Sequence, residues 1–156
     1  MPTYHNWGFP RLGSRTGANV YADLLGVRSR LLAVAYSVSL NTASADVAVP
    51  VSPVPGGFTG TPNYIIRGFT IANASASLST SPTISLFTGA GGTGNTLVSA
   101  QAVTGVTTPI TQYLDITLAA SATGTIQTAN TLYIRTGASN QVAATADFYI
   151  YAEVLP

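Results

Sequence analysis

Short runs of β-forming residues recur along the chain, and this pattern constrains the fold more than any other feature. Val, Ile, Tyr, Phe and Thr gather in these runs, and clusters of Gly, Pro, Asn and Ser separate them. We expect strands at residues 31–40, 45–51, 64–73, 83–88, 96–103, 112–118, 131–136 and 146–154. Only residues 18–26 could form one or two helical turns. Eight short strands with frequent turns predict an all-β protein, an antiparallel sandwich with a jelly roll as the leading topology.

Two of the runs show the alternation that is typical of a half-buried strand. In LLAVAYSVSL the larger side chains fall on the even positions from Leu32 to Leu40, and Tyr36 is one of them. This period of two predicts that the even positions share one face. Residues 146–154 alternate in the same way, and they pair an apolar face with an amphipathic face that carries two tyrosines and Glu153.

The 156 residues divide into an extended N-terminal arm, residues 1–28, and a sandwich domain, residues 29–156. The arm shows neither helical nor alternating periodicity, but it combines aromatic residues with arginine, the types that dominate binding energy at interfaces. Fully extended, it could reach on the order of 90–100 Å. It could clasp a neighbour or pack back across its own body. Its expected partner contacts are Tyr4, Trp7, Phe9, Arg11, Arg15 and Tyr21.

The chain carries unusually little charge. Only 7% of its residues are charged and none is lysine, whereas a typical soluble domain has about 25% charged residues. Its polarity comes from 14 serines and 22 threonines. A neutral surface resists association poorly, and the cores of protein interfaces are depleted in charge. Much of this surface is therefore predicted to be covered by neighbours, and the alternative is a soluble monomer with a Ser/Thr coat.

The charges that are present do not indicate nucleic acid or membrane as a partner. Residues 1–30 carry four arginines and one aspartate, or +3, and residues 31–156 carry two arginines and four acids, or −2. This lacks the strong basic footprint of a nucleic-acid-binding domain. The longest apolar stretch, residues 31–40, is far shorter than the ~20 residues of a membrane-spanning helix. The N-terminus also lacks the pattern of a signal peptide.

The sequence contains few residues that could catalyse a reaction or bind a metal ion. The chain has no cysteine, and its one histidine, His5, lies in the arm. Zinc ligation, thiol chemistry and a Ser–His–Asp triad are therefore not expected. The acids are scattered singly, so no calcium-binding loop is expected, and a carboxylate pair from distant strands, such as Asp115 with Asp147, stays open. We expect no enzyme, no catalytic residues, no metal, no cofactor and no small-molecule substrate.

Two short motifs have ordinary structural interpretations. Gly89, Gly91 and Gly94 spell G-x-G-x-x-G, but the β-rich NTLVSAQAV follows where a dinucleotide site requires a helix. We therefore interpret GAGGTGN as a flexible hairpin loop. Asn73 begins a three-residue glycosylation sequon, a pattern that also arises by chance. The Pro/Gly-rich segment 50–62 is too long for a hairpin, and it predicts either a connection between sheets or an exposed binding loop.

Two segments carry a resemblance to a known family. SPTISLFTGAGGTGNTLVSAQAVT and TLYIRTGASNQVAATADFYIYAEVLP resemble small virion proteins of tailed bacteriophages, the jelly-roll cement or decoration proteins of the capsid surface. The resemblance covers about residues 31–156. It implies a structural virion protein, a homotrimer at threefold sites, that binds the major capsid protein and ties neighbouring subunits together. Terminal arms in this family often grip neighbouring shell proteins, but no binding residue of the family transfers by position.

Two other functions remain open at this point. A fibre or receptor-binding head, including a carbohydrate-binding module, would use Phe58 and Tyr64 near the 50–62 loop as a sugar platform. A subunit of another shell or of a tail tube would self-assemble without a pre-existing lattice.

Overall fold

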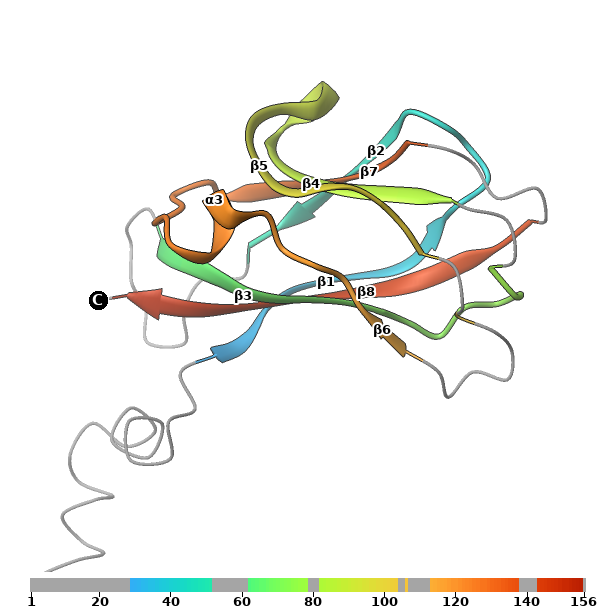
Figure 1. The fold of residues 1–156 in the computed structure, drawn as a ribbon, viewed down its shortest axis with the longest axis horizontal. Coiled ribbons are helices and arrows are strands. Elements are labelled where there is room, and N and C mark those ends of the chain that lie inside the picture. Colours follow the sequence, from blue (N-terminus) through green and yellow to red (C-terminus); the bar gives the residue numbers. More distant parts are fainter. Residues whose placement is uncertain are drawn as a thin grey trace, which may run out of the picture.

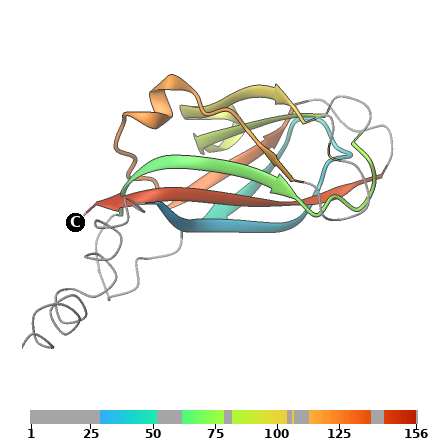
Figure 2. The same ribbon diagram turned by 60° about the horizontal axis from the view of Figure 1, so that its bottom comes forward.

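Eight strands form two four-stranded antiparallel sheets that face each other (Figures 1 and 2). The computed structural model describes residues 29–51, 62–78, 82–103, 106, 113–137 and 143–155. The strands are β1 (Ser29–Ser39), β2 (Ala45–Pro50), β3 (Asn63–Ala72), β4 (Thr83–Gly89), β5 (Thr93–Ala102), β6 (Tyr113–Asp115), β7 (Thr131–Thr136) and β8 (Thr145–Leu155). All eight strands coincide with strands predicted from the sequence, most with bounds shifted by one to three residues.

The order of the strands is that of a jelly roll. One sheet runs β1-β8-β3-β6 and the other runs β2-β7-β4-β5. Every connection except the β4–β5 hairpin therefore passes from one sheet to the other. The predicted antiparallel sandwich and its jelly-roll topology are confirmed. The arm at residues 1–28, which includes the possible helical turns at 18–26, lies outside the described residues.

The core lies between the two sheets and consists almost entirely of apolar side chains. Strand β8 supplies Phe148, Ile150 and Ala152 on alternate positions, all completely buried, as its sequence predicts. Across the sheet, the ring of Phe148 stacks on that of Phe69 with 5.5 Å between their centroids. No buried side-chain polar atom of the described residues lacks a hydrogen-bond partner.

The single alternation predicted for β1 is wrong at its centre. Tyr36 is 70% exposed, whereas Ala33 and Ala35, on the odd positions, are buried. Two irregularities in the pairing of β1 with β8 explain the difference, since each one shifts the phase of the alternation. Ser37 lies in the second of them with a φ of 51°, and its backbone N–H donates to a carboxylate oxygen of Asp147.

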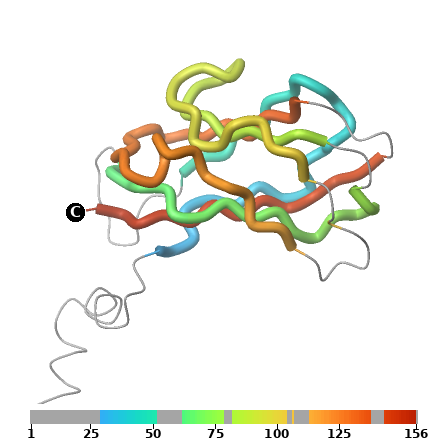
Figure 3. Tube along the Cα trace, viewed as in Figure 1, coloured from blue at the N-terminus to red at the C-terminus, as the bar shows by residue number. Residues whose placement is uncertain are grey.

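Strand β6 is shorter than predicted because the chain crosses between the sheets directly after it. Beyond Asp115 the backbone N–H of Ile116 still donates to Phe69 on β3. The N–H of Thr117 then donates to the side chain of Gln101, and that of Ala119 donates to Leu97, both on β5. The segment leads to the short helix α3 (Ala120–Thr123), and Figure 3 follows its trace from β6 to α3. It thereby closes the sandwich along one side.

The glycine-rich segment after β4 is a hairpin loop, as predicted. A 3₁₀ turn, η2 (Ala90–Gly92), joins β4 to β5. Gly91, Gly92 and Gly94 all have φ between 70° and 77°, a region that residues other than glycine rarely adopt. The carboxylate of Asp46 on β2 accepts the N–H of Gly91 and pairs with Arg135 at 2.8 Å. Residues of the neighbouring strands β2 and β7 therefore hold this loop in place.

Replacement of Gly94 by alanine should destabilise the protein. An added Cβ would collide with Thr88 Oγ1 and lie 3.1 Å from the backbone nitrogen of Gly89, in addition to the strain at a φ of +74°. We expect a loss of about 1–3 kcal/mol in the free energy of unfolding, measured by urea denaturation. Gly124→Ala is the matched control, because nothing lies within 4 Å of its added Cβ and its φ is −122°. Equal losses in the two variants would contradict this account.

Candidate binding groove on the outer sheet face

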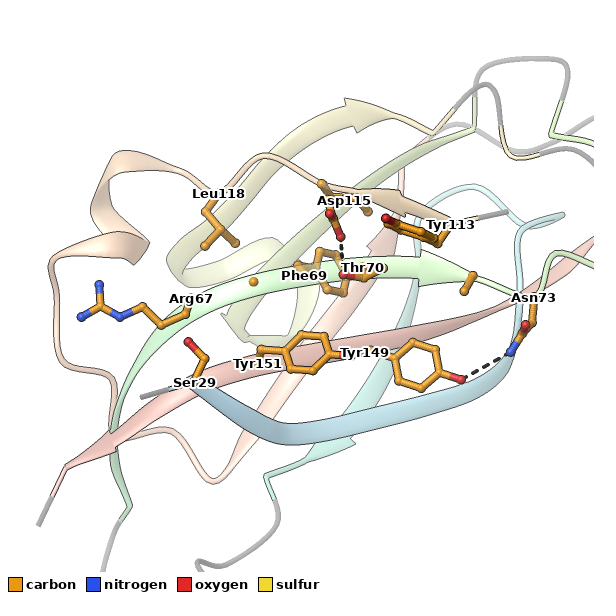
Figure 4. A pocket seen from close by; sticks show the side chains of 13 residues that line it. Ser29, Arg67, Phe69, Thr70, Asn73, Tyr113, Asp115, Leu118, Tyr149 and Tyr151 are labelled. Carbon is orange, nitrogen blue, oxygen red and sulfur yellow. Dashed lines mark hydrogen bonds between the residues drawn. The ribbon is translucent and has the colours of Figure 1, made fainter. Parts of the chain in front are cut away.

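A groove of about 750 Å³ runs along the outer face of the β1-β8-β3-β6 sheet (Figure 4). Its floor is β3, which presents the small residues Gly68, Thr70 and Ala72 to this face. The flanking strands carry much larger side chains opposite these positions. In the pairing register, Gly68 faces Tyr151 on β8, and Ala72 faces Tyr113 on β6. The groove thus results from small residues on a strand between two strands that present tyrosines.

Three tyrosines line this groove, which we call the tyrosine groove. Tyr113 lies on one side of β3, and Tyr149 and Tyr151 lie on the other (Figure 4). A Cβ at Gly68 would stand 3.5 Å from the Tyr151 ring, so this ring lies directly over the glycine. A Cβ would only touch the ring, so the close approach of the Tyr151 ring to the sheet excludes side chains larger than alanine at residue 68. Tyr113 is 68% exposed at the opposite wall.

Polar groups are distributed along the same groove. The Thr70 hydroxyl donates to Asp115 Oδ1 at 2.6 Å. Asn73 Nδ2 donates to Asp147 Oδ2 at 2.8 Å and lies 3.4 Å from the hydroxyl of Tyr149. No hydrogen bond between described residues involves the second carboxylate oxygen of Asp115. The amide of Asn73, the first residue of the sequon, is thus part of a hydrogen-bond network.

The one arginine that lines the groove is already neutralised. Both Nε and Nη2 of Arg67 donate to Glu153 Oε2, at 3.2 and 2.6 Å, and Nη1 donates to the carbonyl of Thr123. The ion pair is partly exposed, so its contribution to stability is small. The ion pair matters for the electrostatics of the groove, because Arg67 is not available to Asp115. The carboxylate of Asp115 is therefore the one charge of the described lining that no cation offsets.

Tyr149 is held protonated by its surroundings. Desolvation raises the pKa of its phenol, and the negative charge of Asp147 and the neighbouring tyrosines raise it further. The ring of Tyr36 meets that of Tyr149 edge-on, with 6.4 Å between the centroids and 88° between the planes. This geometry is one that aromatic pairs prefer. A phenol with the ordinary pKa near 10 is already neutral at physiological pH, and these effects keep the hydroxyl of Tyr149 neutral to higher pH.

The sugar platform predicted near the 50–62 loop is wrong for Tyr64. This residue is completely buried in the core, and its hydroxyl donates to the carbonyl of Ala129 at 2.8 Å. It occupies a position of β3 whose side chain faces the core, so its ring points away from the surface. Phe58, like residues 52–61 as a whole, lies outside the described residues.

The burial of Tyr64 makes the stability of the protein sensitive to alkaline pH. Burial raises the pKa of its phenol well above the ordinary value near 10. Above pH 10 the unfolded chain releases this proton and the folded chain keeps it, so the free energy of unfolding falls as pH rises. The slope reaches about 1.4 kcal/mol per pH unit.

Tyr64→Phe should remove this part of the alkaline slope in urea denaturation between pH 8 and 11. At neutral pH the same variant should lose about 1 kcal/mol, since the carbonyl of Ala129 loses its donor. Tyr113→Phe provides the control, because Tyr113 is exposed at the surface. An unchanged alkaline slope in Tyr64→Phe would contradict the assignment.

The carboxylate pair left open by the sequence is not formed. Asp115 lies on β6 and Asp147 on β8, and β3 runs between the two strands. Asp115 pairs with Thr70 and Asp147 with Ala72, two residues further along β3, which places their backbones about 12 Å apart. Asp147 is bonded to Ser37 and Asn73, and Asp115 to Thr70. Within the described ranges no cluster of three His, Cys, Asp or Glu residues could hold a metal ion, and no helix there has the length and apolar character to cross a membrane.

The partner-contact residues predicted from the sequence all belong to the arm, and Tyr4, Trp7, Phe9, Arg11, Arg15 and Tyr21 lie outside the described residues. Sequence reasoning missed the groove itself. The amphipathic face predicted for residues 146–154 already contained Tyr149 and Tyr151. The sequence held no signal that Tyr113 would face them across β3, since that depends on strand order.

No family model, curated protein or solved structure matches the chain.

Proposed function

We propose that this protein is a structural virion protein that binds the outside of a phage capsid and cements neighbouring capsid subunits. In this proposal it acts as a homotrimer on the major capsid protein, and it stabilises the shell without catalysing a reaction. The virion resemblance of residues 31–156 suggests the location. The observation that carries the proposal is the small number of free charges on the body's surface.

Most charged side chains of the described body bond within it, and four of the seven form ion pairs. Six of the seven charged side chains bond to other groups of the body, through the pairs Arg67–Glu153 and Arg135–Asp46 and the hydrogen bonds of Asp115 and Asp147. The seventh is Arg30, at the start of β1. What remains for neighbours is a surface with little free charge, on which the large apolar side chains of Leu31 and Ile126 and the rings of Tyr36 and Tyr113 are exposed. Such a surface suits close protein contact rather than a free existence in solution.

The outer edge of β1 supports the same interpretation. β1 spans eleven residues and has a strand neighbour on only one side in the described sheet. Its sequence contains a single charge and no lysine, and an edge of this kind invites pairing unless something covers it. The two bulges blunt this edge in part. Contact with a shell or with other copies would cover the rest.

Attachment to a shell provides the direct test. Purified full-length protein is mixed with shells assembled from the major capsid protein of the same genome, and the shells are sedimented. We expect saturable binding at a fixed ratio and shells that dissociate at a higher temperature. Light scattering coupled to size exclusion should give the mass of a trimer. Protein that stays in the supernatant at all ratios would refute the proposal.

A further inference from the structure

We propose that the tyrosine groove binds a neutral saccharide, a function separate from attachment to a capsid. The proposal rests on three properties of the described lining: the disposition of its aromatic rings, the arrangement of its hydrogen-bonding groups, and its charge.

The rings offer flat apolar surfaces on both sides of a shallow floor. A pyranose ring presents C–H groups on its faces and hydroxyls at its edge, so its face packs on an aromatic ring. Tyr151 rests over Gly68 close to the sheet, and Tyr113 is largely exposed at the facing wall. The two rings stand beside opposite ends of the floor, Tyr151 at Gly68 and Tyr113 at Ala72, so two sugars of one oligosaccharide could each pack on one ring.

The polar groups of the groove match hydroxyl groups in particular. An ionised carboxylate only accepts hydrogen bonds, and its two oxygens can accept several. Thr70 uses one oxygen of Asp115, at 2.6 Å, and thereby fixes the orientation of the carboxylate. The other oxygen can accept from the hydroxyls of a sugar. Tyrosine hydroxyls and the Asn73 side chain add groups that both donate and accept along the same trough.

The charge of the lining selects against anions. Arg67 is occupied by Glu153 and the Thr123 carbonyl, which leaves Asp115 as the uncompensated charge of the described lining. A phosphate, a nucleic acid or an acidic sugar would be repelled. A neutral ligand rich in donors is complementary to this groove.

The dimensions of the groove suit an oligosaccharide. Its volume of about 750 Å³ falls within the 300–1,000 Å³ that is typical of small-ligand sites. The floor from Gly68 to Ala72 extends for roughly 13 Å along an open trough. A saccharide chain could therefore lie along β3 and continue past both ends.

The test uses the full-length protein and an array of short neutral oligosaccharides built from glucose, galactose, mannose and N-acetylglucosamine. Isothermal titration then measures the dissociation constant of the strongest array ligand. We expect Tyr113→Ala and Tyr151→Ala each to weaken binding about tenfold, the loss of one stacking partner. Asp115→Asn should also weaken it, since the amide replaces one acceptor by a donor.

Two further variants separate binding from folding. Tyr133→Ala removes a tyrosine from the outer face of the other sheet, where it alternates with buried Leu132 and Ile134, and it should bind as the unchanged protein does. Gly68→Val keeps every tyrosine, but its methyl groups extend beyond a Cβ that would already touch the Tyr151 ring at 3.5 Å. They should displace that ring, and the variant should lose affinity without loss of melting temperature.

Capsid attachment of the same variants is measured in parallel, and it should stay unchanged. Failure of the unchanged protein to bind shells would refute the proposed function and leave the groove untouched. The saccharide proposal would be overturned if no neutral oligosaccharide on the array binds the protein. It would also be overturned if Tyr133→Ala loses as much affinity as Tyr113→Ala and Tyr151→Ala. Groove variants that detach from shells while the array stays empty would identify the groove as a protein-docking face instead.

Discussion

A protein that lacks residues 1–28 is expected to fold normally and to lose its hold on a shell. The described core draws on residues from Leu32 to Ala152, so the deletion removes none of them, and the free energy of unfolding should change by less than roughly 1 kcal/mol. The arm concentrates aromatic residues and arginines, each of which can contribute tenfold or more to binding. We expect the truncated protein to bind shells about 100-fold more weakly, which is two such contributions.

Co-sedimentation with shells over a concentration series measures this effect, and far-ultraviolet circular dichroism verifies the fold. Trp7→Ala and Arg11→Ala should act in the same direction with smaller losses. Ser14→Ala is the matched control in the same arm, since it removes neither an aromatic ring nor a charge. Capsid occupancy that the truncation leaves unchanged would show that the body alone makes the attachment.

The largest loss of stability is expected from Phe148→Ala. The side chain is completely buried, and its ring stacks on Phe69 at 5.5 Å in the centre of the β1-β8-β3-β6 sheet. Its removal takes away apolar burial and leaves a cavity that the paired strands around it cannot close. Truncations of this kind cost about 3–5 kcal/mol.

Urea denaturation measures this loss, and Phe148→Leu, which keeps most of the volume, should cost less than about 1.5 kcal/mol. Tyr149→Ala provides the neighbouring control, since that side chain points outward into the tyrosine groove. A loss in Phe148→Ala no larger than that in Tyr149→Ala would contradict the description of the core.

The eight strands were predictable because each is a local signal. Alternation such as that of residues 146–154 depends only on which side chains follow one another, and it predicted the buried Phe148 and Ile150 correctly. The β1 pattern misled because the two bulges arise in the pairing with β8, and a run of sequence does not contain its partner. The same limit explains Tyr64, which looked like a surface aromatic beside a loop and lies instead on the core-facing side of β3.

The groove was the least predictable feature because it is a property of three strands together. Gly68, Thr70 and Ala72 are unremarkable within their own run. They become a floor only when strand order places Tyr113 on one side and Tyr151 on the other. Asp115 could be identified from the sequence as a candidate, but the partner that the sequence left open for it, Asp147, belongs to a different hydrogen-bond network.

The position of β8 between β1 and β3 has a consequence for how the chain acquires its structure. The last of the eight strands to leave the ribosome fills the middle of its sheet, where it forms contacts such as that between Ser37 and Asp147, 110 residues apart. Such distant pairings give a high contact order, which slows folding. Until β8 emerges, no strand joins β1 to β3. The edges of β1 and β3 that later pair with β8 stay unpaired and are open to other chains. The nascent chain is therefore sensitive to aggregation until β8 is available to pair with β1 and β3.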